Sequence, residues 1–333
     1  MTVDFLFDSL VSLFPSWENT DPFLVISMLI PLVATFGFIT VYALVVIYAE
    51  LKVSSFIQDK VGPMGQGVGL HAGKWGLLQP IADALKLLSK EDIIPSSANK
   101  LLFILAPFMI FVGAFISFIA LPFNGSIIVS DLNIGIFYIL GVGSLAVIAL
   151  ILAGWSSNNK WSLYGGMRSA AQIISYEIPA GLSLIVVIML AGSLNMQEII
   201  IYQQGGISNW IIFDNPFMPI AFVVYFISAL AETNRTPFDL PESESELVAG
   251  FVTEYSGMRY AFFFLSEYAN MFVVSVVAVT GFLGGWQSPF SGSLDSPLMG
   301  VFWMLSKTAF LIFIMINNIM IILNNYTIFL IFF

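Results

Sequence analysis

Long apolar runs alternate with polar connections along this chain, and the pattern predicts a membrane protein built from helices. About 20 apolar residues are enough to cross a bilayer as an α-helix. Runs near or above this length lie at residues 23–48, 101–122, 132–154, 172–192, 213–231, 260–285 and 298–322. The sequence therefore predicts one all-α polytopic membrane domain over residues 1–333, with seven clear transmembrane helices. A last run, 323–333, is too short to cross the bilayer alone.

Lysine and arginine occur almost entirely in alternate connections, and this asymmetry predicts the orientation. The basic connections are 49–100, 155–171 and 232–259. The intervening ones, 122–131, 193–210 and 286–297, contain neither residue. By the positive-inside rule, the three basic connections lie on the cytoplasmic or matrix side.

The first basic connection contains an amphipathic segment, GLLQPIADALKLLSKED. Its apolar residues recur at helical spacing, and Asp83, Lys86 and Lys90 lie mostly opposite them. The pattern predicts a helix at the membrane surface. Two interpretations remain open: a simple membrane anchor, or the rim of an entrance that faces the lipid. The apolar residues are Leu77, Leu78, Ile81, Ala84, Leu85 and Leu88.

Composition narrows the possible chemistry. Of 333 residues, 58% are hydrophobic and 10% charged, whereas soluble domains contain about 25% charged residues. The chain has no cysteine and one histidine, His71, which excludes thiolate-bound iron–sulfur clusters and makes a metal site improbable. The net charge of −10 argues against nucleic acid. The first residues lack the basic start and cleavage pattern of a signal peptide.

An acidic cluster between two apolar runs is the most informative feature of the chain. Seven carboxylates lie between residues 231 and 271, opposed only by Arg235 and Arg259. Charges at bilayer depth are costly and usually face a protein interior or a wet cavity. The cluster therefore predicts handling of protons or cations, or docking of a charged partner. Its carboxylates are Glu232, Asp239, Glu242, Glu244, Glu246, Glu254 and Glu267.

Two acids are predicted inside spans. Glu177 precedes Pro179, which permits a helix break, and this favours a buried protonatable group. The alternative is an ion pair between Glu177 and Arg168. Glu267 has no basic residue three or four positions away, which favours a titrating role over a hydrogen bond to a facing Ser or Tyr. Lys307, in the last long span, is predicted to pair with one of these acids.

Separate predictions concern the acids of the loop PFDLPESESELVAG and the nearby Arg235. Asp239, Glu242 and Glu246 share one face if the chain is helical from residue 243, and like charges so placed raise one another's pKa values. The alternative is a solvated acidic loop at an interface, which we favour for Glu244. Arg235 is predicted to clamp Glu232 or Asp239.

Four segments together identify a family. They are YAELKVSSFIQDKVGP, GLLQPIADALKLLSKED, RSAAQIISYEIPAGLSL and the acidic stretch that begins at AETNRTPFDLPESESELVAG. In this order, over residues 23–316, they resemble the quinone-site membrane subunit (the bacterial H subunit) of respiratory complex I, the proton-pumping NADH:quinone oxidoreductase. The resemblance implies an all-helical, eight-span subunit that is not catalytic alone.

The resemblance also implies roles for individual residues. The quinone entrance would be lined near Lys52, Lys60 and Asp83. The chamber and its docking face would involve Arg168, Arg235 and the acidic residues Asp239, Glu242 and Glu246. The acidic pathway that links quinone chemistry to proton pumping would contain Glu177, Glu232, Glu254 and Glu267. We assign the same three loop acids to this pathway as well.

Cofactors and partners follow from the same resemblance. This chain would bind no cofactor, and a quinone (ubiquinone or menaquinone) would be the substrate. FMN and iron–sulfur clusters would lie on partner subunits. The partners would be hydrophilic iron–sulfur subunits and antiporter-like membrane subunits, in a bacterial inner membrane or alternatively the mitochondrial inner membrane.

The chain departs from the family pattern in three places. Glu50-Leu51-Lys52 replaces the family's Glu-Arg-Lys, and MGQGVGLHAGKWG replaces a basic segment after the first Gly-Pro. Residues 317–333 do not match the family's basic loop and eighth span. We hypothesise a frameshift near residue 316 or 317, with a true truncation as the alternative.

Two rival functions remain open at this point. One is the equivalent subunit of an F420H2 dehydrogenase, a plastid-type complex or a membrane hydrogenase. The other is a stand-alone ion-coupled transporter that uses the same buried acids. The absence of an inverted repeat counts against the transporter.

Overall fold

The computed structural model contains only helices and loops in the part of the chain that it describes. That part comprises residues 21–60, 62–63, 74–235, 237–240, 244–290 and 297–332, with side chains described from residue 29 to 317 except at 74, 244, 245 and the gaps. The α-helices are α2 (Asp21–Ile57), α3 (Gln79–Ser89), α4 (Lys100–Ser117), α5 (Gly135–Ser156), α6 (Lys160–Ala191), α7 (Met196–Tyr202), α8 (Ile211–Asp214), α9 (Met218–Glu232), α10 (Glu244–Leu247), α11 (Gly257–Phe282) and α12 (Pro297–Phe332). The 3₁₀ turns are η3 (Lys74–Gly76), η4 (Phe118–Ala120), η5 (Ile207–Asn209) and η6 (Gly250–Val252).

Six of the described helices are long and apolar enough to cross a membrane, which confirms a multi-pass, all-helical protein. The predicted span at 213–231 corresponds to α9, whose 15 residues reach about 22 Å at 1.5 Å per residue. That is shorter than the hydrocarbon core of about 30 Å. The short helices α7 and α8 precede α9, so its connection is more structured than the sequence predicted.

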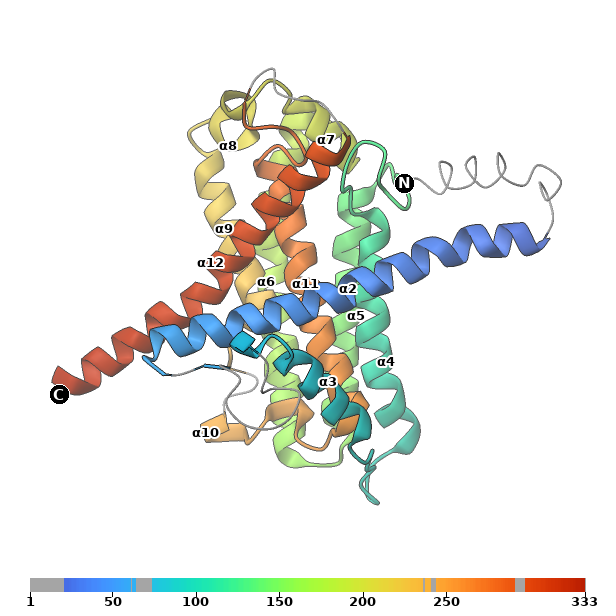
Figure 1. The fold of residues 1–333 in the computed structure, drawn as a ribbon, viewed down its shortest axis with the longest axis vertical. Coiled ribbons are helices and arrows are strands. Elements are labelled where there is room, and N and C mark those ends of the chain that lie inside the picture. Colours follow the sequence, from blue (N-terminus) through green and yellow to red (C-terminus); the bar gives the residue numbers. More distant parts are fainter. Residues whose placement is uncertain are drawn as a thin grey trace.

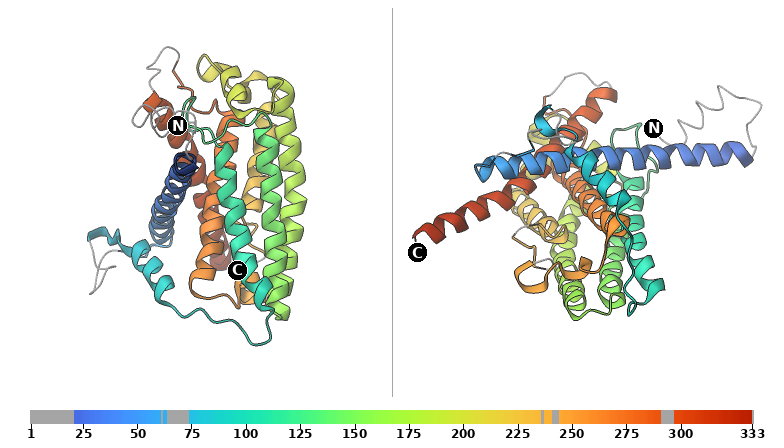
Figure 2. Two further views of the ribbon diagram at one scale, coloured as in Figure 1. Left: turned by 90° about the vertical axis from the view of Figure 1, so that its right-hand side faces the viewer. Right: turned by 60° about the horizontal axis from the view of Figure 1, so that its bottom comes forward.

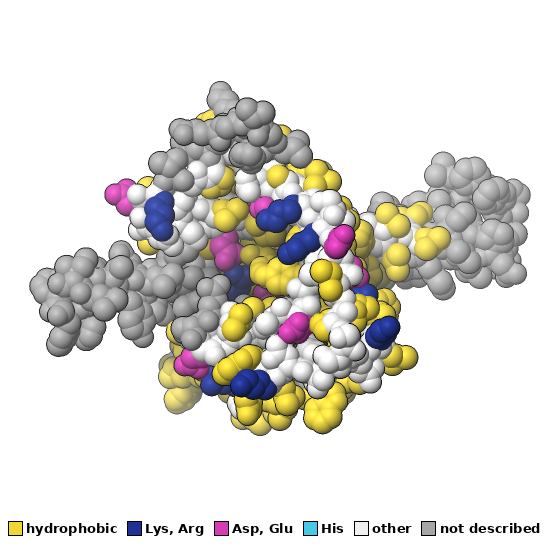
Figure 3. Space-filling model, turned by 90° about the horizontal axis from the view of Figure 1, so that it is seen from below, with side chains coloured by type: hydrophobic (Ala, Val, Ile, Leu, Met, Phe, Trp, Pro, Cys, Tyr) yellow, Lys and Arg dark blue, Asp and Glu magenta, His cyan; other side chains and the backbone are white. Residues whose placement is uncertain are grey.

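Helices α4, α5, α6, α9 and α11 form an upright bundle, and α2 and α12 cross it obliquely on one side (Figures 1 and 2). The three basic connections lie at one end of the bundle, together with α3 and α10 (Figure 1). Seen from that end, Lys, Arg, Asp and Glu side chains are spread among apolar ones (Figure 3). Helices α7 and α8 lie at the opposite end (Figure 1).

Asparagine side chains cap the N-termini of several helices. Asn99 accepts a hydrogen bond from the N–H of Leu102 at α4, and Asn159 accepts one from Trp161 at α6. Asn195 accepts two at α7. Each satisfies backbone N–H groups that have no partner within the helix.

Glycines allow α5, α6 and η6 to approach closely. A Cβ atom at Gly154 would lie 2.6 Å from the carbonyl oxygen of Ser162, and one at Gly165 would lie 2.6 Å from the Cα of Gly250. Small residues at helix contacts are typical of membrane bundles, where packing replaces the hydrophobic driving force. This close packing brings the loop that contains η6 against α5 and α6.

Helix α6 is continuous through Pro179, so the break expected at that proline does not occur. It also begins at Lys160, well before the apolar run at 172, so most of the predicted connection 155–171 is helical. Polar residues such as Arg168 interrupt the hydropathy of the segment without ending the helix.

Helix α12 continues from Pro297 to Phe332. Its span-like part ends at Asn317, and the side chains of residues 318–333 lie outside the described part. The frameshift hypothesis for residues 317–333 therefore stays a prediction.

Candidate functional site

The end of α9 holds Glu232 and Arg235 in defined positions. Asn234 adopts a left-handed conformation with φ of 49°, which asparagine tolerates better than most residues. The N–H of Arg235 donates to the carbonyl of Leu230, and the N–H of Asn234 donates to that of Ala231. This pair of bonds is the Schellman pattern that ends a helix with a sharp turn.

The side chain of Gln172 on α6 connects this turn to the bundle by hydrogen bonds. The Nε2 group of Gln172 lies 2.9 Å from the carbonyl oxygen of Ala231 and 2.7 Å from that of Phe238. It also approaches Oδ1 of Asn234 at 3.3 Å. The loop after α9 is thereby fixed relative to the helix that contains Glu177.

Two small cavities lie beside this loop. The first cavity, of about 20 Å³, is lined by Ile110, Gly143, Ala146, Leu150, Ile173, Glu232, Thr233, Asn234, Phe251, Phe263, Glu267 and Asn270. The second cavity, of about 30 Å³, is lined by Ser117, Ile136, Ile139, Leu140, Gly143, Ala180, Leu184, Tyr225, Glu232, Asn270, Val273, Val274 and Val277. Each is large enough for about one water molecule, which needs roughly 10–15 Å³ of such space.

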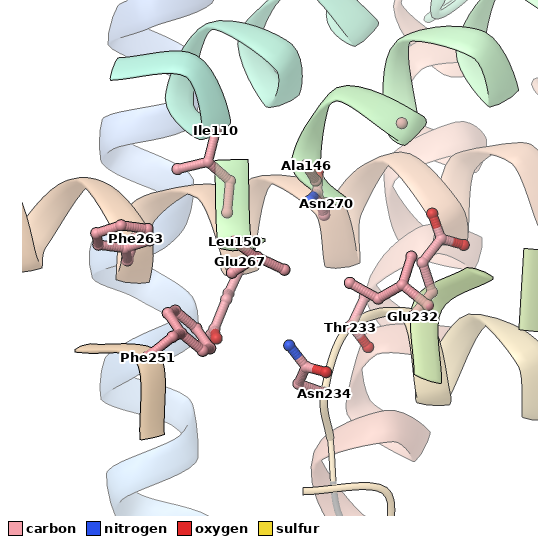
Figure 4. Close-up of a pocket in the computed structure, with 12 residues that line it drawn as sticks. Ile110, Ala146, Leu150, Glu232, Thr233, Asn234, Phe251, Phe263, Glu267 and Asn270 are labelled. Carbon is pink, nitrogen blue, oxygen red and sulfur yellow. The ribbon is translucent and has the colours of Figure 1, made fainter. Parts of the chain in front are cut away.

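Two of the predicted acids line these cavities, and a third lies near one of the two. Glu232 borders both cavities and Glu267 borders the first (Figure 4). Glu177 accepts a hydrogen bond of 2.9 Å from the hydroxyl of Ser144, the residue after Gly143. Glu177 also lies near enough to Glu232 for the two to interact electrostatically. The structure therefore gathers acids from α6, α9 and α11 in one interior region with room for water.

Arg235 forms a buried ion pair with Glu50 of α2. Its Nη1 atom lies 2.9 Å from Oε1 of Glu50, and the two side chains are 11% and 23% exposed. The hydroxyl of Tyr268 donates to Oε2 of Glu50 at 2.8 Å, and the guanidinium lies over the Tyr268 ring. Burial opposes the charge of Arg235, but Glu50, Tyr268 and Glu267 outweigh it and raise the pKa of Arg235. The predicted clamp on Glu232 does not form, because Glu50 has that role.

Arg168 pairs with Glu246 of α10 at 2.7 Å, and both side chains are well exposed. The alternative in which Arg168 neutralises Glu177 is therefore wrong. Lys307 donates three hydrogen bonds to the carbonyls of Leu283, Gly285 and Gln287. The prediction that Lys307 pairs with an acid is also wrong, because carbonyls beyond the end of α11 surround its amine.

Among the remaining predicted acids, Glu254, Asp239 and Glu246 do not line the two cavities. Glu254 accepts a hydrogen bond of 2.7 Å from Asn159, the residue that caps α6. Asp239 and Glu246 are exposed. Glu242 lies outside the described residues, as does the side chain of Glu244. Because Glu242 lies outside the described residues, the shared face of Asp239, Glu242 and Glu246 stays a prediction.

The predicted entrance residues lie on α2, just after it, and on α3. The amine of Lys52 donates to the carbonyl of Pro63 at 2.6 Å, and Lys60 is exposed. Asp83 accepts a hydrogen bond from Gln79 within α3. The apolar side chains of this surface helix remain exposed, from 40% at Ile81 to 59% at Leu88, as expected of a face turned to lipid.

Within the described residues, no group of three or more His, Asp or Glu side chains is arranged to hold a metal ion. His71 and the glycine-rich segment around it lie outside those residues.

Sequence reasoning missed two residues of this region. Glu50 was noted only as part of a family motif, although a charge near the end of an apolar run was a usable signal. Asn270 borders both cavities, and its position three residues after Glu267 placed it on the same helical face. The sequence could not show which groups these side chains face, because those groups lie on other helices.

Comparison with known proteins identifies the family to which the chain is similar. A family model described as NADH dehydrogenase matches residues 30–328. The H subunit of NADH-quinone oxidoreductase from Chlorobaculum tepidum is 51% identical over 302 residues, which cover 87% of this chain and 81% of that protein. The H subunit numbered 2 from Geobacter metallireducens is 46% identical over 308 residues, covering 86% and 84% of the two chains. The corresponding protein from Anaeromyxobacter dehalogenans is 52% identical over 246 residues, covering 74% and 58%.

Proposed function

The chain belongs to the NADH dehydrogenase family, and from this premise we propose that it is the quinone-site membrane subunit of a proton-translocating NADH:quinone oxidoreductase. The observation that carries the proposal is the similarity to the H subunits of NADH-quinone oxidoreductases over most of both chains. This membership favours an oxidoreductase subunit over the stand-alone transporter. The subunit would act only within the assembled complex.

The surface helix α3 and the end of α2 would form the lipid-side entrance for the quinone. Exposed apolar side chains on α3 support this role, because they would lie in the membrane interface. The hydroxyl of Tyr48 in α2 bonds to the carbonyl of Trp75 just before α3, so the two elements are tied together. Lys52, Lys60 and Asp83 would then lie near the entrance.

The acids around the two cavities would couple quinone reduction to proton movement. A change of charge at the quinone alters the protonation of nearby carboxylates, and water-sized spaces beside Glu232 and Glu267 would let protons pass between them. Glu177 joins this group through Ser144. The place of Glu254 and of the loop acids Asp239, Glu242 and Glu246 in the same pathway is a further part of the proposal.

Arg168 and Arg235 would lie along the chamber and its docking face. Arg168 and Glu246 are exposed at the end of the bundle that also presents α10, where hydrophilic partner subunits would dock. Those partners would contain the FMN and iron–sulfur clusters, and antiporter-like subunits would lie beside the chain in the membrane. The membrane would be the bacterial plasma membrane.

Purification of the tagged chain from native membranes tests the assignment. We expect iron–sulfur subunits to co-purify, together with inhibitor-sensitive reduction of a quinone by NADH. An assembled complex that uses another electron donor would move the chain to a related enzyme. A chain isolated without partners would contradict the proposal.

Two substitutions test the acidic pathway in that complex. Glu177→Gln and Glu267→Gln preserve the size of each side chain but remove its titratable proton, so both should impair quinone reduction and proton pumping without preventing assembly. Glu198→Gln is the matched control, because Glu198 is exposed on α7 at the opposite end of the bundle. Unchanged activity and pumping in both acid variants would refute the pathway.

A further inference from the structure

The two cavities share three lining residues: Gly143 of α5, Glu232 of α9 and Asn270 of α11. Glu232 forms no side-chain hydrogen bond with any described residue, although it is not exposed. Polar groups in a protein interior nearly always have a hydrogen-bond partner, either protein or water. The carboxylate of Glu232 is therefore placed to use water in the two cavities.

Asn270 supplies a second polar group at the same place. It follows Glu267 by three residues, so both side chains project from one face of α11. In Figure 4 it lies between the labelled side chains of Glu267 and Glu232. Its amide forms no hydrogen bond with the residues that the structure describes, and it can both donate and accept. A water molecule in the first cavity would find the polar partners that it needs.

Gly143 keeps the opposite wall open. A Cβ atom at this position would lie 3.6 Å from Oε1 of Glu232, which is an ordinary contact and not a clash. A methyl group would therefore fit the fold but would occupy space beside the carboxylate. The next residue, Ser144, bonds to Glu177, so the same turn of α5 borders three acids.

We propose that Asn270 and Gly143 form a water-binding junction that connects Glu267, Glu232 and Glu177. Asn270 is a positioning residue that orients the water, and Gly143 leaves the room for it. A protonated Glu267 gives its proton to the water oxygen while the water gives another proton to Glu232, so the water is restored and charge moves from one carboxyl to the other. The inference rests on the proposed acidic pathway and adds to it the residues that make it continuous.

Substitution of Gly143 gives the sharpest test. In the assembled complex, Gly143→Ala should lower proton pumping per quinone reduced, with a rate loss of about 10-fold, equivalent to about 1.4 kcal/mol of barrier. Gly141→Ala is the matched control, because Gly141 lies on the same helix, is exposed, and has no atom within 4 Å of a Cβ placed there. Both changes replace glycine by alanine in one helix, so their effects on helix propensity are equal.

Asn270 is tested by removing and then restoring a polar side chain at its position. Asn270→Leu should reproduce the Gly143→Ala defect, whereas Asn270→Ser should restore pumping because its hydroxyl and smaller size readmit water. Ser275→Ala is the control for loss of a buried polar group on α11, since Ser275 bonds to the carbonyl of Met271 and the sulfur of Met315 and lines neither cavity. The infrared C=O stretch of Glu232, identified by its loss in Glu232→Gln, should shift in Gly143→Ala and Asn270→Leu but not in the controls.

The outcomes separate the two levels of inference. If the glutamate variants impair pumping while Gly143→Ala and Asn270→Leu behave as their controls do, the junction is wrong and the proposed function stands. If the glutamate variants are fully active, the acidic pathway and the junction fail together.

Discussion

Polar groups inside this protein are accommodated in two different ways, by protein hydrogen bonds around Gln203 and by water-sized cavities beside Glu232. At the α7–α8 end, Gln203 is fully buried, and its amide lies between the carbonyl of Thr280 and the N–H of Gly284. It also bonds to the carbonyl of Ile199 and the N–H of Ile211. Gln203 thus supplies hydrogen bonds to the backbone where α11 ends. In the interior around the two cavities, Glu232 and Asn270 face the cavities and form no such bonds with described residues.

The difference separates a structural polar residue from a functional one. A buried group with a full set of protein hydrogen bonds has little freedom to change its charge or partner. A group that faces a water-sized space can exchange protons, because water accepts and donates without rearrangement of helices. Gln203 and the residues beside the cavities should therefore respond in opposite ways to substitution.

The largest effect on stability is expected at Gln203. Gln203→Leu keeps the volume but removes four hydrogen bonds, and at about 0.5–1.5 kcal/mol for each bond it should cost about 2–6 kcal/mol. The thermal midpoint of the purified complex, followed by its loss of monodispersity, measures this change. Gln204→Leu serves as the control, because Gln204 is the exposed neighbour. Equal midpoints for the two variants would remove the structural role of Gln203.

A smaller change in stability, with a large functional defect, is expected at Glu232. Glu232→Gln should alter the free energy of unfolding by less than about 1 kcal/mol, since the carboxylate loses no protein hydrogen bond with described residues. Proton pumping should nevertheless fall strongly, because glutamine has no titratable proton. Pumping in proteoliposomes and the thermal midpoint should be measured on one preparation. A variant that fails to assemble would show that Glu232 has a structural role, as Gln203 does.

The smallest effect is expected at the exposed pair between Arg168 and Glu246. Both side chains are solvent-accessible, at 46% and 60%, and such pairs contribute about 0–1 kcal/mol. A double-mutant cycle of Arg168→Ala and Glu246→Ala should therefore give a coupling free energy within this range that weakens with added salt. A coupling free energy well above that range, insensitive to salt, would mean that the pair is buried in the assembled complex.

The helices were largely predictable because hydropathy reports membrane-crossing segments directly. The exceptions have physical causes. Polar residues near the start of α6 lower its hydropathy there, so the sequence did not reveal its first turns. Pro179 did not break the helix, because local backbone adjustment can re-satisfy the groups that a proline frees. The short α9 was predicted as a full span because apolar residues continue into the helices before it.

The acids were predictable as a group but their partners were not. Glu177, Glu232 and Glu267 stood out because charge is rare in apolar sequence. Glu232 and Glu267 line the cavities, and Glu177 bonds to Ser144, the neighbour of Gly143. Arg235 was matched with nearby acids, yet it reaches Glu50, which is 185 positions away along the chain. Lys307 was matched with an acid because charge alone was considered, whereas three carbonyls satisfy it.

The amino-acid sequence by itself determined the membrane class, the set of acids and the family, because hydropathy, charge and motifs are properties of contiguous residues. The tertiary structure alone decided which acids share a cavity, which cation pairs with Glu50, and where water has room. These depend on the distances between side chains on different helices, such as the approach of Gly143 on α5 to Glu232 on α9. Packing of the bundle sets those distances, and no local pattern encodes them.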